Sequence, residues 1–212
     1  TPLPAVAESW SSNGSIWTFN LRKNAKWSNG ESVTAKDFVN AWERALNPDT
    51  GAEYSYIMYC IKGAQEYNEG TNKKFSSVGI KAIDNYTLQV TLKEPTIYFP
   101  TLVSFYTFYP QNTNFLKSLK NSVYGDSFND IMGNGAFEIK KSSDKNSLYL
   151  IKSEKYWNKN NVSIDALNFV ITDSKDLIKN YQLKKIDIST LNDENYKKYK
   201  LSKDVKIYED GS

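Results

Sequence analysis

Histidine is absent from this chain of 212 residues, and cysteine occurs only once, as Cys60. A disulfide within the chain is excluded, because it needs two cysteines. A Cys–His nucleophilic pair and a typical zinc site are excluded as well, since both draw on histidine or on several cysteines. The commonest general base of enzymes is missing together with histidine. These absences exclude most familiar hydrolase mechanisms, and we expect a protein that is not an enzyme.

Excess charge of either sign is also lacking. The 27 basic and 24 acidic side chains leave a formal net charge of +3, and the chain has no dense block of Lys and Arg. Lys supplies nearly all of the basic residues, since Arg22 and Arg44 are the only two arginines. Nucleic-acid-binding proteins usually carry a basic patch or stripe, so we expect no nucleic-acid partner. No apolar run approaches the ~18 residues that a membrane-spanning helix needs.

The sequence does contain a substantial apolar and aromatic fraction. Hydrophobic residues make up 40% of the chain and aromatic residues 14%, which is enough to build a core. The spacing of Trp17, Phe19 and Trp42 predicts that these three side chains are buried. Cys60 lies in the aromatic stretch 56–61, and we interpret it as a small buried hydrophobic residue instead of a reactive thiol.

Alternation of apolar and polar residues predicts several strands. The clearest pair is 78–83 and 86–92, which Asp84-Asn85 joins as a hairpin because these two residues tolerate a tight turn. A second hairpin is expected from 137–141 and 148–152, with 142–147 as its loop. Single strands are expected at 16–21, 167–171, 186–188 and 205–208.

Helical spacing of apolar residues predicts a helix that follows Thr34 and stops before Asn47-Pro48. Thr34 and Asp37 are spaced as a capping-box pair at its start. Further helices are expected at 53–67, 97–105, 173–183 and 192–199. Because strands and helices are intermixed along the whole chain, the predicted fold class is α/β, of the mixed α+β kind.

The sequence offers no convincing catalytic group, metal ligand or cofactor motif. Asp193 and Glu194 are adjacent on a predicted helix, so their side chains diverge by about 100° and cannot serve one atom. They are better explained as acids in a solvated first helical turn. Gly133-Asn134-Gly135 is too short for a phosphate-binding loop and is predicted to be a turn before a strand.

Several runs of residues, taken together and in order, resemble one known family. They are residues 4–10, 17–39, 47–50, 88–95, 134–137 and 156–158. This combination is similar to the signature of the family 5 extracellular solute-binding proteins, which include the oligopeptide-binding receptors of ABC importers. The resemblance covers essentially the whole chain.

The resemblance implies a periplasmic-binding-protein type II-like fold of which only a part is present. Residues 1–111 would form most of an accessory α/β domain, and residues 112–212 part of the first ligand-binding lobe. Family members are more than twice as long and close two lobes over their ligand. We therefore expect an internal fragment without the second lobe, in line with ends at Thr1 and Ser212 that look cut.

The resemblance also implies a function. Such a receptor captures oligopeptides and hands them to an ABC permease, without a cofactor and without catalytic residues. It would work at the extracellular face of the cell membrane, as a lipid-anchored lipoprotein of a Gram-positive organism, or in a periplasm. In the family a Tyr after the Asn-Pro-Asp-Thr-like run lines the pocket near the amino end of the ligand, and Tyr54 occupies that place.

Two alternatives stay open at the level of sequence. Some relatives bind nickel chelates, haem or other ligands, and the family's Tyr-Asn pair after an Ile-Asp strand is replaced here by Ser189-Thr190-Leu191 after 186–188. The second alternative lies outside the family. The many aromatic residues would also suit a carbohydrate-binding module or a hydrolase that has not been detected.

Overall fold

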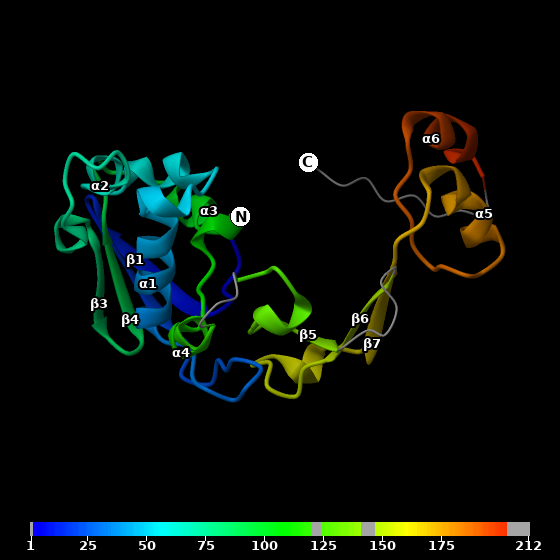
Figure 1. Ribbon diagram of the computed structural model, residues 1–212, viewed down its shortest axis with the longest axis horizontal. Helices are drawn as coiled ribbons and strands as arrows, with labels where there is room; N and C mark the ends of the chain where they lie inside the picture. Colours follow the sequence, from blue (N-terminus) through cyan, green and yellow to red (C-terminus); the bar gives the residue numbers. More distant parts are fainter. Residues whose placement is uncertain (1, 120–123, 141–146, 203–212) are drawn as a thin grey trace. The chain divides into compact units, whose positions relative to one another are not determined.

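The computed structural model describes residues 2–119, 124–140 and 147–202 (Figure 1). It divides into two compact units, the first made of Thr1–Ser142 and Tyr149–Leu167 and the second of Ser143–Leu148 and Asn168–Ser212. The expected boundary at 111/112 concerns the domains of a longer receptor, and it stays a prediction. None of the helices in the described ranges is long and apolar enough to cross a membrane.

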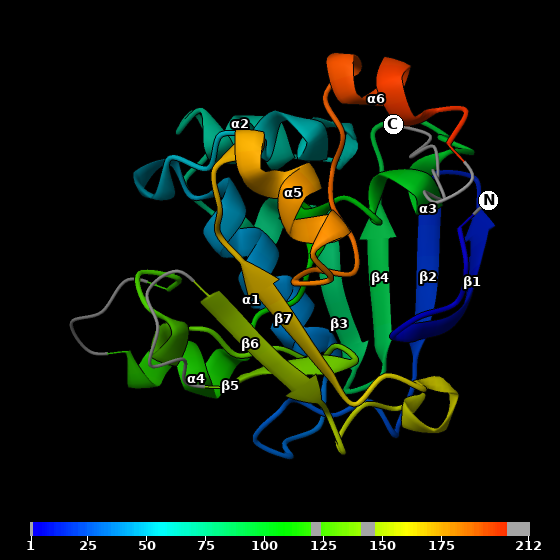
Figure 2. The same cartoon turned by 90° about the vertical axis from the view of Figure 1, so that its right-hand side faces the viewer.

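The first unit is built on an antiparallel sheet of four strands: β1 (Ala7–Asn13), β2 (Ile16–Leu21), β3 (Ile80–Asp84) and β4 (Thr87–Thr91). Figure 2 shows them side by side in the order β1-β2-β4-β3. The strand predicted at 16–21 and the hairpin predicted at 78–92 are confirmed. The sequence gives no signal for β1, because most of its side chains are exposed and do not alternate.

Helix α1 (Ala35–Leu46) packs against this sheet, mainly on β3 and β4. Thr34 and Asp37 form the predicted capping box at its start, and Asn47 follows its last residue. Its inward side chains and those of β2 and β4 share one core. Trp17, Phe19 and Trp42 are all buried there, as predicted.

The aromatic helix predicted at 53–67 is wrong, since two shorter helices replace it. These are η2 (Ser55–Cys60), which is a 3-10 helix, and α2 (Ala64–Asn68). Between them Ile61 bridges to Leu92, and the N–H of Lys62 donates to the carbonyl of Thr91. The backbone therefore pairs with the end of β4 instead of continuing a helix. Gly63 then takes a left-handed φ of 75°, which begins α2 in a new direction.

Short helices complete the first unit. The helix predicted at 97–105 is only four residues long as α3 (Phe99–Leu102), and the chain then turns so that Phe99 and Phe108 both reach the core. Its described residues also form η1 (Pro48–Thr50), η3 (Phe75–Ser77), η4 (Tyr106–Phe108), α4 (Thr113–Ser118), η5 (Phe128–Asp130) and η6 (Lys159–Asn161).

A second sheet follows in the order β5 (Phe137–Lys140), β6 (Ser147–Lys152) and β7 (Ala166–Val170). Strands β5 and β6 pair antiparallel, with Phe137 opposite Lys152. The predicted hairpin and the strand at 167–171 are therefore confirmed. The predicted loop at 142–147 falls mostly outside the described residues.

Three short helices lie in the described part of the second unit. η7 (Ser174–Asp176) and α5 (Leu177–Gln182) stand where one helix was predicted, and the Asp173 side chain accepts a hydrogen bond from the N–H of Lys175 at the start. α6 (Asp193–Tyr199) confirms the last predicted helix. The strand predicted at 186–188 is wrong. Ile188 is 89% exposed, so in the described residues this segment has no core to pack against that would stabilise it as a strand. The strand predicted at 205–208 lies outside the described residues.

Candidate functional site

A cleft of about 570 Å³ opens in the first unit beside the second half of α1. Ala41, Arg44 and Ala45 are spaced i, i+3 and i+4, so they share one face of the helix. The two alanines have short side chains and leave room over the helix, and Arg44 borders this room. The other lining residues are Trp27, Thr50, Ala52, Glu53, Tyr54, Tyr106, Thr107, Tyr109, Pro110, Gln111, Tyr124, Ile131, Met132, Gly133 and Asn134.

Tyr54, the predicted site residue, lines this cleft. The turn before it is fixed locally. The Asn47 side chain accepts a hydrogen bond from the N–H of Asp49, and Gly51 takes a left-handed φ of 61° after η1. Tyr54 then stands at the start of η2. A short, hydrogen-bonded turn therefore positions the Tyr54 ring at the cleft.

The Tyr54 ring belongs to a cluster of aromatic side chains. Its centroid lies 5.5 Å from that of Phe105, 5.7 Å from Tyr106 and 6.2 Å from Tyr56. The first two pairs are edge-to-face, which is a favourable arrangement for aromatic rings. The cluster packs ring against ring, so it forms an aromatic edge to the cleft.

Tyr106 is a neutral hydroxyl at this edge. Desolvation raises its pKa, and the neighbouring Tyr54 hydroxyl and the Glu53 carboxylate raise it further. The side chain nevertheless stays 56% exposed. At neutral pH it is therefore an uncharged polar group beside the cleft.

Arg44 is the positive group of the cleft. It is half-buried, and its Nη1 donates to Gln111 Oε1 over 3.5 Å. The Arg44 charge also reaches Tyr124: burial raises the pKa of Tyr124, and the nearby Arg44 acts against this rise. The guanidinium therefore acts on the interior of the cleft.

A buried carboxylate fixes the wall behind Arg44. Asp37 is 6% exposed, and its Oδ2 accepts hydrogen bonds from Trp27 Nε1 at 3.2 Å and from the Thr34 N–H at 2.8 Å. Its Oδ1 accepts from the N–H and the hydroxyl of Thr113, at 3.1 and 3.0 Å. Trp27 lines the cleft, and so does Gln111, which lies two residues before Thr113. The Asp37 side chain therefore positions two parts of the lining.

Glu31 supports the same segment from outside. It accepts hydrogen bonds from Asn112 at 2.8 Å and from Asn114 at 3.3 Å. These two amides are the main reason why the pKa of Glu31 lies below its ordinary value of 4.5. Asn112 in turn accepts from the N–H of Phe115 and caps α4. The start of α4 is thus tied to the loop before α1.

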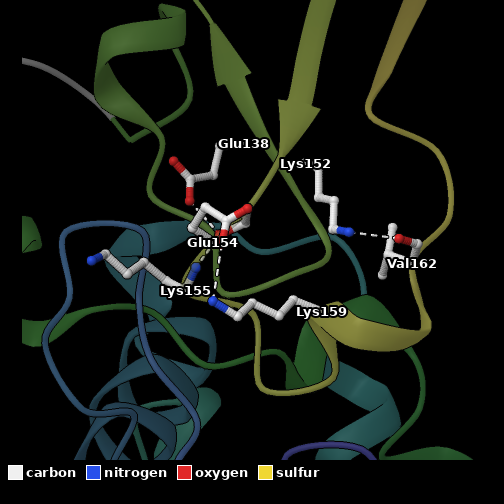
Figure 3. Close-up of polar contacts among 7 residues, drawn as sticks. Glu138, Lys152, Glu154, Lys155, Lys159 and Val162 are labelled. Carbon is white, nitrogen blue, oxygen red and sulfur yellow. Dashed lines mark hydrogen bonds and ion pairs between the residues drawn. The ribbon is translucent and has the colours of Figure 1, made fainter.

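A second polar cluster orders the turn after β6 (Figure 3). The Ser153 hydroxyl donates to Glu138 and accepts from the Lys155 N–H, and Lys159 pairs with Glu154 at 2.9 Å. Lys152 donates to the carbonyl of Val162 at 2.7 Å. Most of these groups bond to neighbouring residues, so we interpret the cluster as one that stabilises the turn and not as a ligand site.

That turn carries Trp157, whose ring faces the guanidinium of Arg22 at 3.9 Å. Arg22 also donates through Nε to the carbonyl of Ala5. A cation over an indole face is attracted by the ring quadrupole. Arg22 therefore joins the segment before β1, the end of β2 and this turn.

An apolar hollow of about 350 Å³ lies between the segment before β1, α1 and the core, and it shares Tyr109, Pro110 and Asn134 with the cleft. Apart from Ser104 and Asn134, its lining side chains are apolar or aromatic. It offers few groups that could orient a ligand, in contrast to the cleft beside α1.

The remaining candidates have structural roles. Asp193 and Glu194 lie in the first turn of α6, and 133–135 leads into β5, as predicted. Cys60 is half-buried against the core, and burial raises the pKa of its thiol. The described residues hold no group of three His, Cys, Asp or Glu side chains that could bind a metal.

The sequence singled out Tyr54 but missed the other polar groups of the cleft. Arg44, Tyr106 and Gln111 come from α1, η4 and the segment after it, and only the fold brings them together. One signal was available: Arg44 is one of two arginines in a chain that otherwise uses Lys. Whether Tyr54 contacts a ligand remains a prediction.

Comparison with known proteins gives a consistent result. The sequence model of the bacterial extracellular solute-binding proteins, family 5 (middle region), matches residues 1–212. The dipeptide-binding protein DppE of Bacillus subtilis (strain 168) is 37% identical over 176 residues, which are 82% of this chain and 32% of that protein. The chain spans about a third of the length of the curated relatives it matches.

Solved structures match over nearly the whole chain. The substrate-binding domain of an oligopeptide ABC transporter from Bacillus anthracis str. Ames gives a TM-score of 0.89 at 39% identity, covering 96% of this chain and 39% of that one. Listeria monocytogenes OppA bound to peptide gives 0.86 at 36% identity, covering 94% and 40%. The mixed α/β fold is thus a part of a substrate-binding protein fold.

Proposed function

Because the chain belongs to the family 5 bacterial extracellular solute-binding proteins, we propose that it is part of a receptor that captures oligopeptides for an ABC importer. The family consists of solute-binding proteins and not of enzymes. The matched proteins are named for dipeptide binding, for oligopeptide transport or for a bound peptide. These names favour a peptide over a nickel chelate, haem or a carbohydrate.

Residues 1–111 would then be an accessory domain of the receptor and residues 112–212 part of its first lobe. The Asp37 and Glu31 bonds to residues 112–114 would join the two. A peptide held between two lobes closes them, and the closed form docks on the permease. The family description supports a place outside the cytoplasmic membrane, and a lipid anchor on a Gram-positive cell would hold the receptor there.

The observation that carries this proposal is the cleft beside α1. It combines a large aromatic edge with a few polar groups, which is the arrangement expected of a pocket for varied peptide side chains. Tyr54 lies at this edge, where the family's pocket-lining tyrosine is expected. We propose that Tyr54 contacts the ligand near its amino end.

Calorimetry of the full-length receptor with a mixed peptide library tests the function. Heat of binding with peptides is the expected result. Absence of heat with every peptide, together with tight binding of a nickel chelate or of haem, would show that the receptor serves another ligand.

Replacement of Tyr54 by Phe in the full-length receptor tests the site residue. The variant keeps the ring contacts to Phe105 and Tyr106 and loses only the hydroxyl. We expect peptide binding to weaken by about 0.5–1.5 kcal/mol, the contribution of one hydrogen bond. Tyr59→Phe is a matched control, because the Tyr59 hydroxyl bonds to Asn68 at 2.6 Å and does not line the cleft. Equal affinities of Tyr54→Phe and the unchanged receptor would remove Tyr54 from the site.

A further inference from the structure

We propose that Arg44 makes the cleft beside α1 selective for a carboxylate of the bound peptide. The inference rests on the proposed function, because it takes the cleft to be a peptide subsite. It adds the chemical class of the group that this subsite receives: the side chain of Asp or Glu, or the terminal carboxylate.

The first reason is that Arg44 has unused bonding capacity. A guanidinium presents five N–H donors in a planar fork. In the described part of the chain, its side chain makes one hydrogen bond, the 3.5 Å contact with Gln111, and none of the ion pairs there includes it. The other arginine, Arg22, has the carbonyl of Ala5, the carboxylate of Glu8 and the ring of Trp157. Arg44 is therefore the arginine that remains open to a ligand.

The second reason is its position. Arg44 is half-buried and borders the hollow left by Ala41 and Ala45, so its charge is less screened by water than that of an exposed lysine. Within the part of the chain that the structure describes, the one acidic residue in the lining is Glu53, which is exposed and makes no ion pair with Arg44. An entering anion thus meets the guanidinium without having to displace a carboxylate.

The third reason is the match of shape and charge. The planar fork of arginine binds a carboxylate through two parallel hydrogen bonds. Among the described residues that line the cleft, Arg44 is the one basic side chain, and its charge balances one carboxylate but only part of a phosphate. The Tyr106 hydroxyl adds a polar group at the aromatic edge, and its raised pKa keeps it uncharged at neutral pH.

The test is calorimetry of the full-length receptor with paired peptides. In one series Glu replaces Gln at one position at a time, and in the other a free carboxyl terminus replaces an amide. The two series distinguish a side-chain carboxylate from the terminal one. In one of them we expect the charged peptide to bind about tenfold more tightly than its neutral partner.

Substitution of Arg44 completes the test. Arg44→Gln is expected to remove the preference, so that the charged and the neutral peptide bind with equal affinity. Arg44→Lys, which keeps the charge without the fork, is expected to retain a part of the preference. Lys36→Gln is the control, because Lys36 is exposed on the first turn of the same helix. This substitution removes one positive charge, as Arg44→Gln does. The Lys36→Gln variant should keep the full preference. If Arg44→Gln does not fold, the comparison of Arg44→Lys with Lys36→Gln decides.

Two results would overturn the inference and leave the function intact: neutral and charged peptides that bind equally to the unchanged receptor, or a preference that survives in Arg44→Gln and Arg44→Lys. Failure of every peptide to bind, charged or neutral, would instead remove the proposed function and the inference with it.

Discussion

At the scale of single residues, Asp37 combines two roles that act on distant parts of the chain. The first is local: it caps α1 together with Thr34, three residues before it. The second joins it to Thr113, 76 positions away. The capping role could be predicted from the spacing of the two residues, because it depends on neighbours in the sequence. The contact with Thr113 could not, because it depends on how the chain returns to α1.

Asp37→Asn tests how much this side chain contributes to the stability of the fold. An amide offers one accepting oxygen in place of two and turns an NH₂ group toward existing donors. We expect the free energy of unfolding to fall by about 1–3 kcal/mol, since either the buried Trp27 N–H on one oxygen or the part-buried Thr113 donors on the other lose their acceptor. Urea unfolding measures the loss. Asp49→Asn, at an exposed position, is the control and should stay within about 0.5 kcal/mol.

Glu31 gives the same region a dependence on pH. Its hydrogen bonds with Asn112 and Asn114 hold its pKa in the folded state below the ordinary 4.5. The folded state therefore favours the ionised form, so this contribution to stability is present above pH 4.5 and is lost as the pH falls through the lowered pKa. Glu31→Gln should melt below the unchanged chain at pH 7, and the gap should close at acidic pH. Glu94→Gln, exposed after β4, should show no such gap. A gap for Glu31→Gln that is equal at both pH values would contradict this account.

At the scale of elements, the sequence predicts best where burial follows a simple period. Helix α1 and the hairpin of β3 and β4 have one buried face each, and their bounds were predicted closely. The aromatic stretch 53–67 has apolar residues at many positions and so could not reveal where its helix breaks. The break comes from Ile61 and Lys62 pairing with the end of β4, a contact between residues far apart in the sequence.

Gly63 is the point at which this break can be tested. Its φ is 75°, and an added Cβ would lie 2.9 Å from the Ser77 carbonyl oxygen. Gly70 has a similar φ of 74° with nothing within 4 Å of an added Cβ, which makes it a matched control. We expect Gly70→Ala to cost about 1–2 kcal/mol from the left-handed backbone alone, and Gly63→Ala to cost clearly more. Chemical denaturation of both variants measures the difference. Equal losses would mean that the contact with Ser77 relaxes freely.

At the scale of the whole molecule, the family could be identified from sequence because its motifs stand at turns and caps that the fold uses. The region around Asn47 and Pro48 forms η1, and Trp157 faces Arg22. The composition of the cleft could not be identified in this way. Its lining combines residues from 27 to 134, and no single motif contains them.

The 212-residue chain by itself is expected to bind peptides more weakly than micromolar. It spans about a third of the length of its curated relatives, so it offers one wall of the proposed site and none of the energy of lobe closure. Titration of this chain with the peptides that bind the full-length receptor measures the difference. Micromolar affinity of the 212 residues alone would show that the cleft beside α1 is sufficient.

Cys60 makes this protein convenient to tag. Its thiol is half-buried, hydrogen-bonded to the carbonyl of Ile57 and less acidic than an exposed cysteine, so it reacts slowly with maleimides near neutral pH. A second cysteine engineered at the exposed Tyr109 would carry a fluorophore at the rim of the cleft while the native thiol stays largely unmodified. The one cysteine of these 212 residues thus leaves an almost silent background for an optical probe placed at this cleft.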